Sequence, residues 1–348
     1  MPPTSKLKRI RRSLLHWYDH KQRDLPWRRT RNPYAIWIAE TMLQQTRVTT
    51  VLPYYRSFMK TFPTLRALDR APKNSVLALW SGLGYYRRAE NIKAAARKIR
   101  REHGGRIPQD FRTLCTLPGI GAYTAGALLS IAFNRPYPAL DGNARRVLGR
   151  LFQIKSAGEL RRVAGSLMSR SRPGEFNQAL MDLGATTCLA GDPNCRICPV
   201  TRFCAARRSG DFHRHSSAKA RPQVKNVEWP LALIVKNNRI LLRRRPEGGL
   251  LGGLWEVPGG QKKRGESSEA TLARHLNGLA GQLESLSFLD ELRHHITDHR
   301  IRAPLFIYPD TKKIRLRGPT WRWVPLSSLQ RYPLSSLSLK AIRLLRHR

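Results

Sequence analysis

The chain has 348 residues, more than one domain usually holds, and this length predicts two domains. No run of residues approaches the roughly 18 apolar positions of a membrane span, and the basic N-terminus lacks the apolar core of a signal peptide, so we expect a soluble protein without an anchor. With 64 basic and 23 acidic residues, the formal charge of +41 predicts a polyanionic partner, and interleaved Trp and Tyr favour nucleic acid over a membrane surface.

The predicted elements divide the chain into a helical part, a connector and an α+β part. Apolar residues recur at helical spacing from residue 5 to about 206, as in Ile36, Ala39 and Leu43. Residues 207–228 carry many charges and predict an exposed linker. Two strands (229–235 and 239–245) then flank a turn, followed by a helix at 269–280 and strands at 301–309 and 320–326. We therefore predict domains at 1–206 and 229–348.

Four of the five cysteines crowd into residues 188–204 with the spacing C-x6-C-x2-C-x5-C: Cys188, Cys195, Cys198 and Cys204. Since no secretory signal is present, disulfides are a poor explanation. Thiolates suit zinc or an iron-sulfur cluster, and the spacing alone leaves these two about equal. The fifth cysteine, Cys115, lies in an apolar helical segment and is predicted to be a core residue.

A glycine-containing turn, LPGIG, joins two helical stretches at residues 117–121. Gly119 and Gly121 permit a tight turn with bare backbone N–H groups at a helix N-terminus, which can bind a phosphate or can simply connect packed helices. About twenty residues later, ALDGNARRV places Asp141 and Asn143 at the start of a helix, where either could be an ordinary cap.

These motifs together resemble the helix-hairpin-helix DNA glycosylases, and the cysteine spacing resembles that of the endonuclease III and MutY glycosylases. The resemblance covers nearly the whole chain. It implies an all-α helix-hairpin-helix glycosylase domain whose loop at 188–204 holds a [4Fe-4S] cluster and orders a basic surface against DNA.

The resemblance implies that Asp141 is the catalytic carboxylate. Cleavage of an N-glycosidic bond builds positive charge on the deoxyribose, and an anion held against the sugar stabilises it. Glu40 lies in the mostly apolar segment IWIAETMLQQT, where burial would raise the pKa of its carboxyl. The match to the MutY form of this segment implies that Glu40 donates a proton to adenine N7. Asn143 and Tyr123 complete the predicted catalytic set.

Tyr123 also separates two kinds of glycosylase. Family members that nick the strand carry a lysine two places after the second hairpin glycine, where its amine forms a Schiff base. This chain has Tyr123 there, which implies a monofunctional enzyme that hydrolyses with water.

Enzymes that act on a stacked base flip it out and fill the gap with side chains. Gln45 and Tyr85 match the intercalating residues of the family. In the alternative interpretation, Trp27, Tyr85 and Tyr86 are merely core aromatics. The complete set of predicted DNA and substrate contacts in this part of the chain is Trp27, Arg28, Leu43, Gln44, Gln45, Tyr85, Gly119, Gly121 and Gln178.

The segment GGLWEVPGG (252–260) resembles the strand and loop that lead into the Nudix box of MutT hydrolases. After it, Glu266 is present, but residues 274–278 replace the metal-binding R-E-aliphatic-x-E-E run, so Mg²⁺ would be poorly held. A non-catalytic Nudix-like domain is the MutY arrangement and implies recognition of 8-oxoguanine. Thr297 falls in a loop that loosely matches the family's recognition loop, and His294 or His299 could replace the missing histidine.

The sequence thus predicts a monomeric, monofunctional adenine DNA glycosylase of the bacterial cytoplasm, acting on duplex DNA with A opposite 8-oxoguanine or G and leaving an abasic site. The alternatives are an endonuclease III-like enzyme for oxidised pyrimidines or G·T mismatches, a DNA-binding regulator without chemistry, and a Nudix phosphohydrolase. Tyr123 and the second domain argue against the first. Glu40 and Asp141 argue against the second, and the broken box argues against the third.

Overall fold

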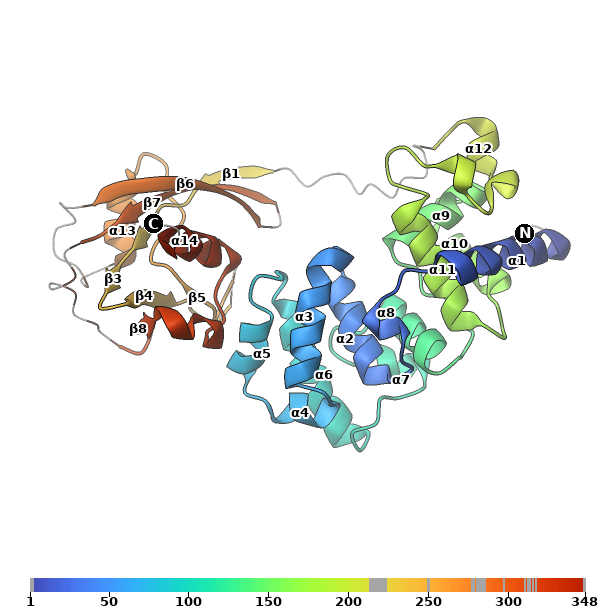
Figure 1. The fold of residues 1–348 in the computed structure, drawn as a ribbon, viewed down its shortest axis with the longest axis horizontal. Helices are drawn as coiled ribbons and strands as arrows, with labels where there is room; N and C mark the ends of the chain where they lie inside the picture. The colour runs from blue at the N-terminus through green and yellow to red at the C-terminus, as the bar shows by residue number, and fades with distance from the viewer. Residues whose placement is uncertain are drawn as a thin grey trace. The chain divides into compact units, whose positions relative to one another are not determined.

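The computed structural model describes residues 3–212, 224–248, 251–276, 279, 286–296, 298–309, 311, 314, 316 and 318–346. The chain forms two compact units (Figure 1). Unit 1 comprises Met1–Arg70 and Asn91–Lys219, and unit 2 comprises Ala71–Glu90 and Ala220–Arg348. The predicted order, an all-α part followed by an α+β part, is confirmed. The domain limits stay a prediction.

Much of the predicted linker, residues 213–223, lies outside the described residues. Its two ends have regular structure. Helix α12 continues to Ser209, and Lys225–Glu228 form strand β1, which pairs with β7.

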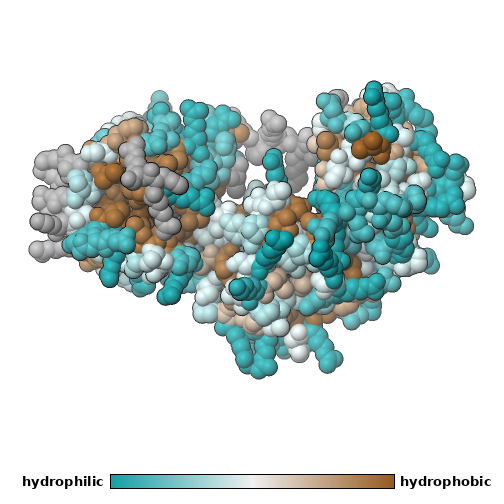
Figure 2. All heavy atoms as spheres, viewed as in Figure 1, coloured by the Kyte–Doolittle hydropathy of each residue, from teal (hydrophilic) through white to brown (hydrophobic). Residues whose placement is uncertain are grey.

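Unit 1 is helical. Its elements are α1 (Thr4–Lys21), η1 (Pro26–Arg28), α2 (Pro33–Leu43), α3 (Val48–Thr61), α4 (Leu65–Arg70), most of α6 (Arg87–Glu102), α7 (Phe111–Cys115), α8 (Ala122–Ala127), η2 (Leu128–Ala132), α9 (Gly142–Phe152), α10 (Ala157–Leu167), α11 (Pro173–Thr186), η3 (Cys195–Ile197), η4 (Thr201–Phe203) and α12 (Ala205–Ser209). Hydrophilic side chains gather over the part that contains α1 and α10 to α12 (Figure 2). None of the helices in the described part of the chain is long and apolar enough to cross a membrane.

One hydrophobic core of unit 1 is built from the inward faces of α1, α9, α10 and α11. It includes Ile10, Leu14, Leu148 and Phe176, all at most 1% exposed. Three of the loop cysteines, Cys188, Cys198 and Cys204, pack against the edge of this core. The core therefore fixes α9 and α11, the two helices that carry Asp141 and the cysteine loop.

Unit 2 contains α5 (Lys73–Leu79) and two sheets. The first sheet joins β1 (Lys225–Glu228), β2 (Leu231–Leu233), β6 (Ser287–Ile296) and β7 (His299–Ile307), with β1 and β2 parallel to β7 and β6 antiparallel to it. The second joins β3 (Val235–Lys236), β4 (Arg239–Arg244), β5 (Trp255–Glu256) and β8 (Trp321–Pro325). The remaining elements are α13 (Ser268–Leu276), η6 (Leu326–Arg331) and α14 (Ser336–Arg346).

The segment 71–90 packs within unit 2 although the sequence places it among the helices. The hydroxyl groups of Ser81 and Tyr86 both donate to the carbonyl oxygen of Leu334, and Leu334 N–H donates to Ser81 Oγ at 3.0 Å. Tyr86 Oη also accepts the N–H of Gly82 at 3.1 Å. These bonds tie the turn before Tyr85 to the strand-rich part of the chain.

The predicted turn between the strands at 229–235 and 239–245 is confirmed, because Asn237 and Asn238 both adopt positive φ between β3 and β4. The prediction for Cys115 is wrong. Helix α7 has only five residues and turns Leu114 inward, so that Cys115 is exposed.

Candidate active site

Helix α2 carries Glu40 into the interior of unit 1. Asn32 caps this helix by accepting the N–H of Tyr34 at 2.9 Å, and Pro33 occupies its first position. Every residue from Tyr34 to Met42 is buried, because α3, α8, η2 and η1 surround the helix. Glu40 is 4% exposed, so its carboxyl has left water almost completely.

Burial raises the pKa of Glu40 from 4.5 to about 7. Tyr123, on α8, donates its hydroxyl to Glu40 Oε2 and thereby lowers this pKa, whereas the nearby charge of Asp141 raises it. A carboxyl with a pKa near neutrality can hold a proton and release it at physiological pH. Glu40 is thus suited to act as a general acid.

Asp141 caps the N-terminus of α9. Its Oδ1 accepts the N–H of Ala144 at 2.7 Å, and its Oδ2 accepts Nδ2 of Asn143 at 3.1 Å. Burial raises the pKa of Asp141, but these donors and the charge of Arg146 oppose the rise. Two donors therefore favour the ionised form of Asp141, whereas a single donor, the hydroxyl of Tyr123, favours the ionised form of Glu40.

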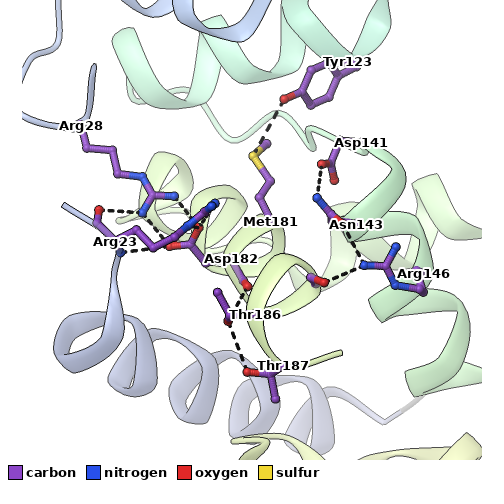
Figure 3. A network of polar contacts seen from close by, with 11 residues as sticks. Arg23, Arg28, Tyr123, Asp141, Asn143, Arg146, Met181, Asp182, Thr186 and Thr187 are labelled. Carbon is purple, nitrogen blue, oxygen red and sulfur yellow. Dashed lines mark hydrogen bonds and ion pairs between the residues drawn. The ribbon is translucent and has the colours of Figure 1, made fainter. Parts of the chain in front are cut away.

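Asn143 connects Asp141 to a buried arginine (Figure 3). Arg146 donates Nη2 to Asn143 Oδ1 at 2.8 Å and to the carbonyl of Gly184 at 2.6 Å, and its Nε donates to the carbonyl of Cys188 at 2.8 Å. A Cβ on Gly184 would lie 2.6 Å from that of Asn143, so glycine is needed for this approach of α9 and α11. The network links Asp141 to the first cysteine of the loop.

The segment before Asp141 is fixed by Asn177 on α11. Its Oδ1 accepts the N–H of Ala139 at 3.1 Å, and its Nδ2 donates to the carbonyl of Tyr137 and to Ser130 Oγ, each at 2.8 Å. Asn177 is 1% exposed. A buried side chain with all three partners holds the backbone that leads to Asp141.

Arg28 is held by the buried carboxylate of Asp182, a residue for which no role was predicted. Its Nη1 and Nη2 donate to the two oxygens of Asp182 at 2.6 and 2.7 Å, and Arg23 reaches the same carboxylate (Figure 3). Its guanidinium also lies over the ring of Tyr18, 5.6 Å from the centroid. Burial opposes the charge of Arg28, but the Asp182 bonds outweigh burial and raise its pKa.

Asp182 is 0% exposed. Burial alone would raise its pKa, yet the bonds from Arg28 and Arg23 hold that pKa below the ordinary value. The sequence signal was an aspartate inside the apolar helix FNQALMDLG, where a buried acid needs a cationic partner.

The other predicted contacts from α2 and α11 are half-buried. Gln44 Nε2 donates to Thr124 Oγ1 at 3.3 Å, Gln178 Nε2 donates to the carbonyl of Gly174 at 3.3 Å, and Leu43 ends α2. The ring of Trp27 is 4% exposed and packs edge-on against Tyr55, which favours a core position, and its assignment as a DNA contact stays a prediction.

The predicted hairpin lies between α7 and α8. Gly119 has a φ of +76°, and a Cβ there would come within 2.7 Å of Asn91 Cβ, so the turn requires glycine. Gly121 is the N-cap of α8 and faces open space. This geometry leaves room for a phosphate at the turn.

Gln45 and Tyr85 share an unusual backbone conformation. Their φ angles are +57° and +49°, and residues other than glycine and asparagine rarely adopt this backbone conformation. Both are exposed, Tyr85 by 48%. Backbone strain at exposed residues is characteristic of ligand-contacting positions.

The four loop cysteines line one largely apolar cavity, together with Arg150 and Phe212. Arg150 is 1% exposed and donates to Cys188 Sγ at 3.5 Å and to the carbonyl of Leu189 at 2.6 Å. Burial raises the pKa of Cys198 to about 12, and the neighbouring cysteines add to this rise. Within the described residues, no three His, Cys, Asp or Glu side chains converge on a point that would hold one metal ion.

In unit 2, the described residues of the Nudix-like part form no cluster of three ligands that could hold a metal ion. Glu266 is occupied by Arg274, whose Nε and Nη2 donate to it at 2.8 Å, and by Thr271 at 3.0 Å. Thr297 lies outside the described residues. Of the two candidate histidines, His299 pairs with Asp298 at 2.8 Å, while burial lowers the pKa of His294 to about 4.

Comparison with known proteins agrees with this geometry. The model of the HhH-GPD superfamily of base excision DNA repair proteins matches residues 38–170, and that of the NUDIX domain matches residues 231–344. The adenine DNA glycosylase of Rattus norvegicus is 37% identical over 72% of this chain and 60% of its own length. That of Buchnera aphidicola subsp. Acyrthosiphon pisum is 34% identical over 88% of this chain and 91% of its own. The chain belongs to the adenine DNA glycosylase family.

The family membership confirms a helix-hairpin-helix glycosylase part followed by a Nudix-like part. The chain spans 60% of the length of the rat relative and 64% of that of the human one. Among solved structures, a thermostable thymine-DNA glycosylase has 29% sequence identity and a TM-score of 0.56, over 59% of this chain and 98% of its own. This similarity covers the helical part of the adenine DNA glycosylase fold.

Proposed function

We propose that the chain hydrolyses the N-glycosidic bond of adenine mispaired with 8-oxoguanine or guanine in double-stranded DNA and leaves an abasic site. The observation that carries the proposal is a pair of buried carboxyl groups with different surroundings, Glu40 and Asp141. A proton donor and an anion in different surroundings are what acid-assisted glycosidic cleavage requires.

Glu40 supplies the proton. Expulsion of an adenine anion is difficult, so the base must gain a proton, at N7, as the bond breaks. With a pKa of about 7, Glu40 is substantially protonated in a neutral cell, and Tyr123 holds the carboxyl in one orientation. Loss of this acid should reduce the rate about 10²- to 10⁴-fold.

Asp141 stabilises the positive charge that develops on the deoxyribose. The N–H of Ala144 and the amide of Asn143 favour its ionised form and fix both of its oxygens. A preorganised anion of this kind contributes about 10²- to 10³-fold to the rate. Among the described residues around Glu40, Tyr123 stands where a lysine would be needed for a Schiff base, which supports hydrolysis by water.

The test uses purified protein and four duplexes that contain A opposite 8-oxoguanine, A opposite G, a G·T mismatch or thymine glycol. We expect strand breakage at A alone, and only after alkali. Breakage without alkali would contradict the monofunctional mechanism. Cleavage at G·T or thymine glycol would favour the pyrimidine-specific alternative, whose fold neighbour is the thymine-DNA glycosylase.

Two variants assign the carboxylates. Glu40→Gln and Asp141→Asn should each bind the A:8-oxoguanine duplex with nearly normal affinity and excise adenine at least about 100-fold more slowly. Glu102→Gln, an exposed glutamate paired with Lys98, is the matched control and should have normal activity. Near-normal excision by Asp141→Asn would refute its assignment.

The cysteine loop suits a [4Fe-4S] cluster held by Cys188, Cys195, Cys198 and Cys204. Four half-buried thiols that line one cavity would repel one another as thiolates without further positive charge among them. All four thiols line the same largely apolar cavity, and cysteine-only ligation is typical of a [4Fe-4S] cluster. When bound, such a cluster would order the loop at 188–204 and thereby position the basic side chains of this loop for contact with DNA.

Metal analysis tests the cluster. We expect about four iron and four sulfide per chain and broad visible absorbance, both lost in Cys198→Ala and kept in Cys115→Ala. One zinc per chain and no sulfide would overturn the assignment.

The strand-rich part supports recognition of the base opposite adenine, with Thr297 and its neighbours at the end of the β6–β7 pair as the proposed reading loop. Both candidate histidines are half-buried, and His299 pairs with Asp298 at 2.8 Å. Thr297→Ala should narrow the preference for A:8-oxoguanine over A:G, measured as the ratio of single-turnover rates. An unchanged ratio would place recognition elsewhere.

A further inference from the structure

One face of the β6–β7 pair carries two basic cross-strand pairs. Arg293 lies directly opposite Arg302, and His295 lies directly opposite Arg300. Residues two apart on a strand point to the same side, so these four side chains share one face. All four are exposed, whereas Ile301 and Ala303 point to the buried side.

The charges on this face are only partly compensated. Arg302 contacts Glu228 at 2.5 Å and Glu291 at 3.5 Å, and Lys262 contacts the same Glu228. Within the described parts of the chain, no carboxylate reaches Arg293 or Arg300, and Arg300 Nε instead donates to His295 Nε2 at 3.3 Å. Like charges directly opposite on a sheet are unfavourable, which points to an anionic ligand.

The face is hollowed, which gives a ligand room. The hollow has a volume of about 630 Å³ and is lined by Asn226, Val227, Glu228, Arg293, His295, Arg300, Ile301 and Arg302. The opposite side of the sheet packs against α14 and its apolar residues. The basic side is therefore the face of this sheet that a partner could meet.

We propose that this basic face of the β6–β7 pair binds the phosphate backbone of duplex DNA. The inference rests on the proposed function for its choice of occupant. The net charge of +41 argues for a polyanion over an acidic peptide. The two cross-strand pairs lie about 7 Å apart along the strands, close to the separation of neighbouring phosphates on one DNA strand.

Arginine suits this task. Its planar guanidinium donates to two phosphate oxygens at once and stays charged at any cellular pH. Phosphate contacts fix the register of a protein on DNA without reading sequence. The basic face would thus set the position of the reading loop and act equally on damaged and undamaged duplexes.

The test compares the full-length chain with Arg293→Gln/Arg300→Gln, which leaves the Arg302 ion pairs intact. Binding to a duplex with an uncleavable abasic analogue opposite 8-oxoguanine, and to an undamaged duplex, is measured over a range of salt concentrations. Each lost phosphate contact reduces the slope of log K against log salt by about 0.9. We expect the slope to fall by between one and two on both duplexes and affinity to drop about tenfold at low salt.

Two controls sharpen the result. Lys236→Gln/Arg239→Gln removes a matched exposed basic cross-strand pair from the β3–β4 turn and should leave the slope unchanged. Arg293→Lys/Arg300→Lys should restore the slope. Equal melting temperatures of all variants would show that the fold is intact.

An unchanged slope for Arg293→Gln/Arg300→Gln, or an equal loss in the Lys236→Gln/Arg239→Gln control, would overturn the proposal. Failure of adenine excision by the unmodified chain would instead contradict the proposed function. The undamaged duplex keeps the two outcomes separate, because phosphate binding needs no excision.

Discussion

Glu40→Gln should stabilise the protein at high pH. The pKa of Glu40 is raised by burial from 4.5 to about 7, so in this interval the folded chain holds a proton that the unfolded chain has released. Stability must then fall as pH rises from 4.5 to 7. Glutamine has the same shape and stays neutral, so the variant escapes this loss.

The magnitude follows from the shift. A difference of one pKa unit corresponds to about 1.4 kcal/mol. The interval between pH 5 and the pKa of Glu40 in the folded chain, about 7, spans about two such units. The stability of Glu40→Gln relative to the unmodified chain should therefore be about 3 kcal/mol greater at pH 8 than at pH 5. Any change in packing caused by glutamine cancels, because it is present at both pH values.

Urea unfolding of both proteins at pH 5 and pH 8, without DNA, measures this difference. Glu102→Gln, exposed on α6, is the control and should change stability by less than about 0.5 kcal/mol at either pH. A stability difference that is the same at pH 5 and pH 8 would show that Glu40 ionises normally, and its role as the acid would then lose its physical basis.

Three other perturbations test the rest of the geometry. The single-turnover excision rate should fall about tenfold per pH unit above pH 7 as Glu40 ionises. Tyr123→Phe removes a hydrogen bond that lowers the pKa of Glu40, so the pH at which the rate begins to fall should rise by about one unit. A shift of this pH to lower values would contradict the assignment of Glu40. Asp182→Asn leaves Arg28 buried without its counter-charge and should lower the free energy of unfolding by about 3 kcal/mol, whereas Asp24→Asn, which breaks an exposed pair with Arg29, should change it little. Tyr86→Phe removes the acceptor of the Gly82 N–H, so hydrogen exchange at that amide should accelerate at least several-fold, and unaltered exchange would mean that the bond is not formed in solution.

The features that could be predicted from the sequence depend on neighbouring residues. The turn at Asn237 and Asn238, the hairpin at Gly119 and the cap at Asp141 each rest on a residue type that suits a local backbone conformation. The burial of Glu40 followed from the apolar residues on every side of its helix. Local patterns of this kind need no knowledge of the fold.

Contacts between distant residues could not be predicted in the same way. Arg28 and Asp182 are 154 positions apart, and only the packing of η1 against α11 joins them. Trp27 was predicted to contact DNA because the segment LPWR resembles a family motif, and only the fold shows that its ring is 4% exposed. Single residues beside a functional motif carry no signal for which way their side chains point.

Strand β6 was not predicted because its alternation is broken. A bulge between Phe288 and Asp290 shifts the register, so polar and apolar residues no longer alternate along its length. Helix α14 did carry a signal, since Leu337, Ala341 and Ile342 have helical spacing and form part of the core.

The different hydrogen-bond environments of Glu40 and Asp141 originate in their positions within their helices. Glu40 lies in mid-helix, where every backbone N–H is already used by a carbonyl four residues earlier, so its buried carboxyl finds only the hydroxyl of Tyr123. Asp141 lies at a helix N-cap, where free N–H groups and the helix dipole favour an anion. Burial raises the pKa of both carboxyl groups. At Glu40 the Tyr123 hydroxyl is the donor that opposes this rise, whereas at Asp141 the N–H of Ala144 and the amide of Asn143 both oppose it. Two carboxyl groups placed in this way suit the proposed roles of proton donor and anion.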